Sequence, residues 1–247
     1  MSKNVYILII CCLVLSSCGV RQSLKDRPDL STYQAENYNR VQLNDSLFTI
    51  GDNFLKKNST QNWELYVSGD PLQIKKKTGV LTKELYAFQE QSFMKLVDQF
   101  VPSKGRQRFL FKILKFYNRD LHHYIKNEYK AQIYGISQSA DNRYDELIDP
   151  YNRNLFLHGA HDIGHAMQDL MLVGCSSLAV WNEKSEDGGL LIGRNFDFYA
   201  NDDFAKNKLV SFIKPQTGFP YMSVTWAGMI GVSSGMNTEG LTVTINA

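Results

Sequence analysis

The spacing of apolar residues divides the chain into a helical part and a strand-like part, and the change falls at Gly174 and Cys175. Apolar residues recur at three-to-four-residue spacing from Leu85 to Phe100, which predicts an amphipathic helix that ends before Pro102–Gly105. Another apolar stripe runs from Phe109 to about Ile136. A third helix is expected over Asn154–Leu172. The chain is therefore predicted to have a mainly helical region before Cys175.

The second stripe is rich in aromatic residues. Such residues at helical spacing are typical of a helix face buried in the protein core, and we do not read them as a cofactor site. The residues of this stripe that we expect in the core are Phe109, Ile113, Phe116, Tyr117, Leu121, Tyr124 and Ile125.

Strand patterns lie on both sides of the helices. Leu47–Leu55 is expected to begin the folded part, and Trp63–Val67 reads as a short strand that ends in a turn at Ser68–Pro71. After Cys175 the alternation predicts a hairpin of Ser177–Trp181 and Leu190–Asn195. Further strands are expected at Leu209–Ile213, Tyr221–Trp226, Met229–Val232 and Leu241–Ile245, with Gly235–Gly240 as the turn between the last two.

The first residues are typical of an export signal. Lys3 precedes an apolar run over Val5–Leu15, which is too short to cross a bilayer core of roughly 30 Å. Leu15, Ser16, Ser17 and Cys18 resemble a bacterial lipobox, which implies a lipidated Cys18 as the first residue of the mature protein. The alternative is an ordinary cleaved signal with an incidental cysteine. We expect a protein of the bacterial cell envelope, lipid-anchored or periplasmic.

Composition excludes some partners. The 247 residues are 43% apolar and 12% aromatic, which is ordinary globular content. A net charge of +2 argues against nucleic-acid binding, and the basic run Lys75–Lys77 is interpreted as a solvated turn. Three of the four cysteines belong to the leader, so Cys175 has no intramolecular disulfide partner in the exported chain.

Three histidines share one face of the third predicted helix, namely His158, His161 and His165. The spacing of His161 and His165 matches helical zinc sites, but Asp162 stands where such proteases carry a glutamate. Gly159 and Gly164 also weaken the helix. We expect a buried polar network near the Gly174–Cys175 bond, and no metal or other cofactor.

A thiol at the start of a strand acts as a nucleophile only if a base removes its proton, because an unperturbed cysteine has a pKa near 8.5. No histidine follows Cys175, although one from the preceding helix could fold back. If the chain is cut between Gly174 and Cys175, the new α-amine, with a usual pKa of about 7.7 to 8.0, can take that proton.

Two ordered motifs follow Cys175. The first is Gly193–Phe198, and the second is Gly235, Met236, Asn237, Gly240 and Leu241, followed by a strand that ends at Asn246. Together they resemble the amino-terminal nucleophile hydrolases of the choloylglycine hydrolase, acid ceramidase and penicillin acyl-coenzyme A acyltransferase group. That resemblance implies an α+β fold, with a helical pro-region followed by a four-layer αββα hydrolase domain. Val67–Gly79 loosely resembles the opening of such pro-regions, with Lys75 where glycine is common.

The resemblance also implies residue roles. Cys175 would attack an amide carbonyl and form a thioester, and Arg194 would hold the thiolate ionised. Asp197 would accept a hydrogen bond from the α-amine of Cys175, and Asn246 would donate to the oxyanion. Asn195 is expected to support the hairpin. Autocleavage between Gly174 and Cys175 would release the nucleophile. Each role has an alternative. Cys175 could be a buried thiol without a chemical role, Arg194 and Asp197 could form a structural ion pair, and Asn246 could simply end a strand.

The expected organisation is a signal peptide at 1–17, a tether at 18–45, a mainly helical pro-region at 46–174 and part of a hydrolase domain at 175–247. The last segment is short for a core of about 200 residues, so we expect a longer natural protein. The predicted function is cleavage of a linear carbon–nitrogen bond in a small amphipathic amide, by hydrolysis or acyl transfer. A non-catalytic binding lipoprotein and a histidine metalloprotein are the alternatives. The oligomeric state is left open.

Overall fold

The strand patterns that precede the helices form one end of an eight-stranded sheet. They appear in the computed structural model, which describes residues 19–34, 36–166, 173–198 and 202–246, as an antiparallel meander. Its strands are β1 (Val41–Asn44), β2 (Leu47–Ile50), β3 (Asn53–Lys57) and β4 (Trp63–Gly69). Buried and less buried positions alternate along β4, as the sequence pattern predicts.

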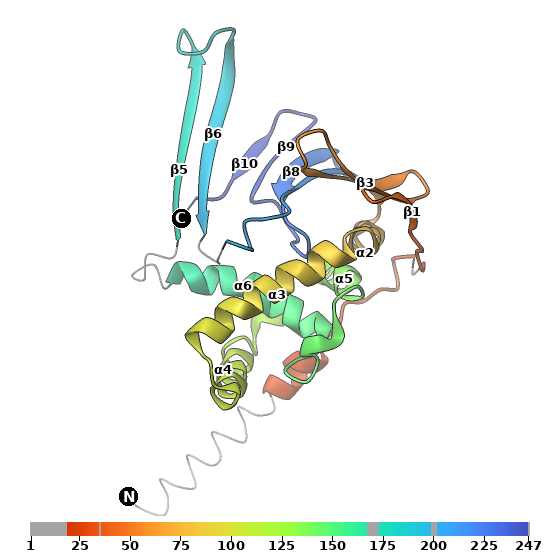
Figure 1. Cartoon of the computed structure of the whole chain (residues 1–247), viewed down its shortest axis with the longest axis vertical. Coiled ribbons are helices and arrows are strands. Elements are labelled where there is room, and N and C mark those ends of the chain that lie inside the picture. Colours follow the sequence, from red (N-terminus) through yellow and green to blue (C-terminus); the bar gives the residue numbers. More distant parts are fainter. Residues whose placement is uncertain (1–18, 35, 167–172, 199–201, 247) are drawn as a thin grey trace, which may run out of the picture.

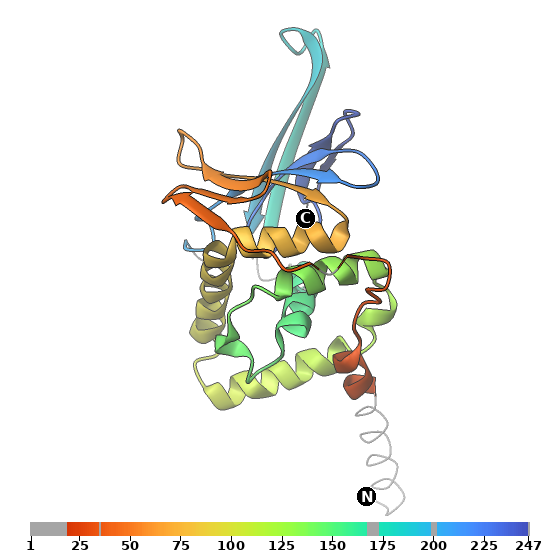
Figure 2. The same ribbon diagram turned by 90° about the vertical axis from the view of Figure 1, so that its right-hand side faces the viewer.

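The other half of the sheet comes from the end of the chain. It contains β7 (Leu209–Pro215), β8 (Tyr221–Thr225), β9 (Ser234–Asn237) and β10 (Thr242–Thr244), and the order is β1-β2-β3-β4-β7-β8-β9-β10. The central pair, β4 and β7, is parallel, with Trp63 opposite Leu209. Segments from before and after Cys175 therefore share one sheet, seen as orange and blue strands side by side in Figure 2.

One helix, α2 (Pro71–Leu81), lies directly against the sheet (Figure 2). It begins where the turn cluster ends, because Asp70 and Gln73 form a capping box and Pro71 occupies the first turn. The sequence patterns did not predict this helix. Residues of α2 and of the sheet form a common apolar cluster, whose members include Leu55, Leu65, Val67, Ile74, Leu81, Leu209 and Ile213.

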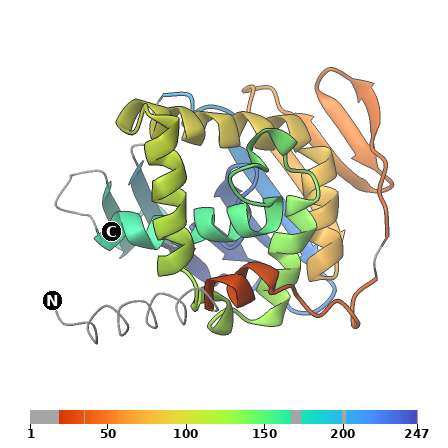
Figure 3. The same ribbon diagram turned by 90° about the horizontal axis from the view of Figure 1, so that it is seen from below.

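The remaining helices form a second layer on the side of α2 away from the sheet (Figures 1 and 3). They are α3 (Lys83–Phe100), α4 (Lys104–Tyr117), α5 (Asn127–Ser137) and α6 (Pro150–Ala166), with 3-10 turns at Leu121–His123 and Asn142–Tyr144. The break between α3 and α4 falls at Pro102, as predicted. The predicted α+β class is confirmed.

A long hairpin stands apart from the sheet. Its strands are β5 (Val173–Asn182) and β6 (Gly188–Phe198). Among the strands that the structure describes they pair only with each other, and the hairpin projects from the body in Figure 1. Side chains such as Leu178 and Leu190 are 65% and 62% exposed. The hairpin predicted from the alternation after Cys175 is confirmed.

The amino-terminal segment contacts the helices. Residues 19–25 form a short helix, Leu24 packs in the cluster around Tyr151, and Arg27 pairs with Asp149 at 3.1 Å. The part of the expected tether that the structure describes therefore lies along the folded body, until β1 joins the sheet.

The strand expected at Met229–Val232 is wrong. These residues form a loop, and β9 instead overlaps the first half of the stretch that was expected to be a turn. Gly228 and Gly231 have φ angles of +88° and +77°, which interrupt extended backbone. The loop bonds to helices: Ile230 N–H donates to His158 Nε2 at 2.8 Å, and the Met229 carbonyl accepts from Lys75 Nζ at 3.2 Å.

The interpretation of the second apolar stripe as core is also wrong for most of its residues. Leu121 and Ile125 are partly buried, but the others are exposed on or beyond α4. Gln107 fixes which side of α4 faces inward, because its buried amide donates to Asp98 at 2.6 Å and to the Val101 carbonyl at 2.7 Å. The exposed residues are Phe109, Ile113, Phe116, Tyr117 and Tyr124.

The basic run Lys75–Lys77 is part of α2 and not a solvated turn. Lys75 is 7% exposed, and its Nζ donates to the Met229 carbonyl. The side chain of Lys77 reaches the Ser68 carbonyl at 2.8 Å. Burial lowers the pKa of Lys75 to about 8, because an ammonium loses hydration inside the protein.

The pKa of Lys75 predicts a pH-dependent stability. Between pH 8 and about pH 10 the unfolded chain keeps the proton that folded Lys75 has released, so the free energy of unfolding increases with pH. In that window the increase should be about 2 kcal/mol larger for the wild type than for Lys75→Met. Urea unfolding at several pH values measures it. If the free energy of unfolding changed with pH by the same amount in both proteins, the lowered pKa of Lys75 would be contradicted.

Candidate active site

Cys175 lies near the start of β5, directly opposite Phe196 of β6. The side chain is half-buried and is a free thiol. Because side chains alternate along strands, Cys175 and Ser177 share one face of the hairpin with Arg194 and Phe196, the residues opposite them. The peptide bond between Gly174 and Cys175 lies within the strand.

Arg194 joins the hairpin to the large sheet. Its Nε donates to Asn246 Oδ1 at 3.4 Å, and its terminal nitrogens contact Ser234 Oγ and the Ile245 carbonyl. The guanidinium carbon also lies 4.4 Å from the ring centre of Phe196, which is the residue opposite Cys175. Arg194 therefore places a permanent positive charge on the face of the hairpin that carries the thiol.

Asn246 reaches the same face from the end of the chain segment that follows β10. Its Nδ2 donates to Ser177 Oγ at 3.2 Å, and its Oδ1 accepts from Arg194. The structure thus brings Arg194 and Asn246 together beside Ser177. Ser177 follows Cys175 by two residues and lies on the same face of the hairpin. An amide N–H and a guanidinium at one place can stabilise an oxyanion and a thiolate.

Asp197 lies on the opposite face of the hairpin. It is opposite Gly174, and its carboxylate accepts two hydrogen bonds from Asn195 Nδ2, at 2.8 and 3.1 Å. In the uncut chain the nitrogen of Cys175 is a peptide N–H within β5, so the expected bond from an α-amine has no counterpart here. Asn195 holds the carboxylate next to the bond that is expected to be cut.

The second motif builds the turn between β9 and β10. The side chain of Asn237 accepts from Glu239 N at 3.0 Å and from Leu241 N at 2.9 Å, and Gly240 has a φ of +80°. Gly235 lies opposite Ser223 in the pairing of β8 and β9. A Cβ at Gly235 would lie 2.5 Å from the Met222 carbonyl oxygen, so the strands need glycine at this position.

We expect Gly235→Ala to destabilise the protein by about 1 to 3 kcal/mol, because the added methyl forces β8 and β9 apart. Gly193→Ala is the matched control, since a Cβ at Gly193, in the other motif, would meet no atom within 4 Å. Thermal unfolding followed by circular dichroism measures both. Equal melting temperatures for the two variants would contradict a packing role for Gly235.

His158 does not fit the metal-site alternative. Its Nε2 accepts the Ile230 N–H, so its Nδ1 is the nitrogen that carries the proton and donates to the Asn154 carbonyl at 2.8 Å. Both nitrogens are engaged, as expected for a polar network. The side chains of His161 and His165 lie outside the described residues. The described part of the chain contains no cluster of three or more metal-binding side chains.

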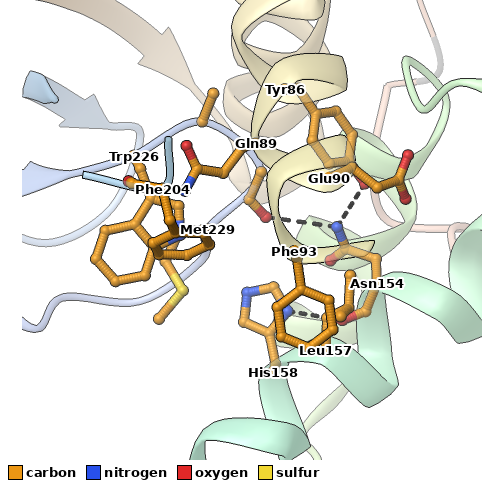
Figure 4. Close-up of a pocket in the computed structure, with 12 residues that line it drawn as sticks. Tyr86, Gln89, Glu90, Phe93, Asn154, Leu157, His158, Phe204, Trp226 and Met229 are labelled. Atoms are coloured by element: carbon orange, nitrogen blue, oxygen red, sulfur yellow. Dashed lines mark hydrogen bonds between the residues drawn. The ribbon is translucent and has the colours of Figure 1, made fainter. Parts of the chain in front are cut away.

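A mainly apolar cavity of about 160 Å³ lies between α3, α6 and the loop after β8 (Figure 4). Asn154 crosses its wall, donating to Tyr86 Oη at 2.7 Å and to the Gly228 carbonyl at 3.4 Å. Asn154 Oδ1 is buried and has no hydrogen-bond partner among the described residues. The other side chains at the cavity include Gln89, Glu90, Phe93, Leu157, His158, Phe204, Trp226 and Met229.

Aromatic rings connect this cavity to the hairpin. Trp226 stacks on Phe196 with ring centres 6.2 Å apart, and Phe204 meets the same indole edge-on at 5.3 Å. Phe196 lies opposite Cys175 in the hairpin. One wall of the cavity is therefore in contact with the residue paired with the candidate nucleophile.

A buried ion pair supports the helical wall of the cavity. Arg153 of α6 donates from Nε to Glu90 Oε1 of α3 at 2.5 Å, and their side chains are 4% and 2% exposed. The guanidinium also binds Asp145 at 2.9 Å and the carbonyls of Asp141 and Ile148. Burial raises the pKa of Glu90, while Arg153 opposes this. The pair fixes α3 against α6.

The comparisons with known proteins agree with the motif assignment in the carboxyl-terminal segment. Residues 181–247 match the family of acyl-coenzyme A:6-aminopenicillanic acid acyl-transferases. The match includes Arg194, Asp197 and Asn246 and begins a few residues beyond Cys175. It supports an enzyme of the acyltransferase or hydrolase type and the amino-terminal nucleophile group.

A search of curated proteins gives a relative that aligns with about half of this chain. An uncharacterized protein of Archaeoglobus fulgidus is 27% identical over 129 residues, which is 49% of this chain and 21% of that protein. The chain thus spans about a fifth of the length of this curated relative. Because the alignment covers so little of that protein, any enzymatic activity of this chain is a proposal.

Sequence reasoning missed several residues around the site. Ser177 could have been found, because it follows Cys175 by two positions on a strand and therefore shares its face. Ser234 adjoins the second motif, which is a weaker signal. The residues Tyr86, Asn154 and Trp226 are far apart in the sequence, and only the packing of α3 and α6 on the loop after β8 brings them to one cavity.

Proposed function

We propose that this chain is an exported, self-processing cysteine amidohydrolase or acyltransferase that cleaves a linear carbon–nitrogen bond through a thioester on Cys175. The observation that carries the proposal is the meeting of Arg194 and Asn246 beside Ser177, on the hairpin face that bears the thiol. The family match over residues 181–247 gives independent support at the level of enzyme type.

Activation would begin in the uncut chain. Cys175 Sγ attacks the Gly174 carbonyl carbon, the peptide carbon–nitrogen bond breaks, and the thiol proton passes to the departing nitrogen. Water then hydrolyses the thioester, which leaves a carboxylate on Gly174 and a free thiol and α-amine on Cys175. Asp197 is held opposite Gly174 by Asn195, where its carboxylate can receive a hydrogen bond from the new α-amine.

Turnover would reuse the same groups. The α-amine accepts the thiol proton, Sγ attacks the substrate carbonyl, and the nitrogen of the substrate departs with a proton. Asn246 Nδ2 would leave Ser177 Oγ to donate to the oxyanion, and Arg194 would stabilise the thiolate. Water or another acceptor then takes the acyl group from Cys175.

The cavity suggests which part of the substrate is held. Its walls are mainly apolar, and its volume of about 160 Å³ fits a short alkyl or aryl group. We assign the cavity to the apolar part of a small amphipathic amide. The helices α3 and α6 of the proposed pro-region form two walls of the cavity. Cleavage before Cys175 would free these helices to move and so to change the size of the cavity.

Residues 1–18 lie outside the described structure, and their role stays part of the proposal. An export signal at 1–17 and a lipidated Cys18 would place the enzyme in the bacterial cell envelope. The division into a pro-region at 46–174 and a four-layer hydrolase domain from Cys175 onward is likewise proposed. A lipid anchor would keep the enzyme at a membrane surface, where amphipathic amides concentrate.

Mass spectrometry of the purified protein, together with release of free amine from N-acyl substrates, tests the proposal. We expect two polypeptides, one of which begins at Cys175, and amine release that follows the extent of cleavage. A single intact chain that turns over substrate would overturn self-processing. Complete cleavage without turnover of any acyl amide by the natural full-length protein would overturn the enzymatic assignment.

A further inference from the structure

The outward side of α4 carries large apolar side chains. Phe109 and Tyr117 are 65% and 70% exposed, and Ile113 and Phe116 lie between them on the same side at 46% and 45%. Phe109, Ile113 and Tyr117 follow one another at spacings of four residues, and Phe116 lies three residues after Ile113, so the four side chains share one side of the helix and form a row along it. We call this row, Phe109, Ile113, Phe116 and Tyr117, the α4 surface.

Basic residues border the α4 surface. The 14 residues of α4 contain five lysines or arginines and no acidic residue. By helical periodicity, the exposed Arg108 and Lys112 lie along one side of the apolar row, and the exposed Arg106 lies in line with the row, one turn before Phe109. Lys104 is paired with Asp98, and Lys115 donates to the Leu147 carbonyl, so the charge that faces outward comes mainly from these three residues.

The α4 surface lies close to the start of the described chain. A Cβ placed on Gly19 would lie 3.6 Å from Arg119 Cδ, just beyond the end of α4. Figure 2 shows the helix of residues 19–25, in red, beside that end, with α4 along the lower edge of the molecule. The apolar row, its basic border and residue 19 thus belong to one region of the molecule.

We propose that the α4 surface binds an anionic lipid bilayer, with α4 lying in the plane of the interface. Aromatic side chains on a basic amphipathic helix insert at the boundary of headgroups and acyl chains, while lysine and arginine contact anionic lipid. The 14 residues of α4 are fewer than the roughly 20 needed to cross a bilayer, which suits a position at the interface. Among the described residues, no helix is long and apolar enough to span a membrane. This contact is separate from acylation of Cys18 and does not require it.

The charge distribution argues for a bilayer over a second copy of the chain. In a symmetric dimer the same basic residues would face each other across the interface, which is repulsive. An anionic surface offers the complementary charge along the whole row. Lys112 and Arg108 would contact headgroups while the neighbouring rings enter the apolar layer.

Vesicle co-sedimentation tests the proposal with residues 19–247, which include every helix and strand described here and lack both leader and lipid. Vesicles of phosphatidylcholine with about one-third phosphatidylglycerol supply the anionic surface. We expect binding that weakens about tenfold or more in Phe109→Ser/Phe116→Ser and in Arg108→Gln/Lys112→Gln. Binding to pure phosphatidylcholine should be weaker than to the anionic vesicles.

The matched control is Leu178→Ser/Leu190→Ser on the β5–β6 hairpin, because these side chains are as exposed as Phe109. It should bind vesicles like the wild type, and circular dichroism should be the same for all variants. Failure of the wild type to bind anionic vesicles overturns the proposal, as does equal loss in the hairpin control. Light scattering that shows a dimer, dissociated by Phe109→Ser/Phe116→Ser, would assign the α4 surface to a second copy instead.

Discussion

Replacement of Cys175 by alanine should abolish both cleavage of the chain and turnover of acyl amides. Removal of the nucleophile from a covalent catalyst lowers kcat by a factor of roughly 10⁴ or more, even when the other groups remain in place. Arg194 and Asn246 keep their contacts with Ser177 and Ser234 in the variant, since none of these bonds involves the thiol. The loss would therefore report the chemistry of Sγ.

Ser176→Ala is the control for this experiment. Ser176 is the next residue of β5, is exposed and projects from the other face of the hairpin, opposite Asn195. Its variant should be cleaved and should turn over substrate like the wild type. Intact-mass measurement detects the cleavage, and a fluorogenic amine assay detects turnover. Cleavage or turnover that persists in Cys175→Ala would assign the chemistry to another residue.

Replacement of Arg153 by methionine should lower the free energy of unfolding by about 3 to 5 kcal/mol. The substitution leaves Glu90 as an unpaired charge in a buried position, and loss of one partner from such a pair costs this amount. The variant also removes the hydrogen bonds to the carbonyls of Asp141 and Ile148. Because α3 and α6 wall the cavity, binding of an apolar ligand there should weaken as well.

Two further variants make the test specific. Lys104→Met removes an ion pair with Asp98 whose side chains are largely exposed, and it should cost less than about 1 kcal/mol. Arg153→Met/Glu90→Leu removes both buried charges and should recover part of the lost stability. Urea unfolding measures all three. Similar losses for Arg153→Met and Lys104→Met would show that burial does not strengthen the Arg153 interaction.

Where an apolar pattern was bounded by clear turn residues, the sequence predicted the secondary structure well. The helix that became α3 was predicted from apolar residues near helical spacing and from the stop at Pro102, and the hairpin from two strand-like segments around a polar, glycine-rich turn. The loop at Met229–Val232 was missed because its apolar residues are not held by strand pairing. They are held by His158 and Lys75, which come from two distant helices.

The α4 surface gives a second reason for a wrong prediction. Helical periodicity identifies which residues share a face, but α4 has apolar residues on more than one face. The face turned inward was decided by the buried amide of Gln107 and its bonds to the end of α3. The spacing of apolar residues along one helix carries no information on a hydrogen bond between that helix and another.

By itself, the amino-acid sequence predicted the α+β class, the switch from helices to strands near Cys175 and the residues that we propose for acyl transfer. The switch follows from local spacing, whereas the fold class and the residue roles were implied by the resemblance of two short motifs to a known family. Tertiary structure alone decided that β4 pairs with β7, that Arg194 meets Asn246 and that α3 and α6 enclose a cavity. Each of these contacts joins residues far apart in the chain, and its stability depends on packing and desolvation in three dimensions.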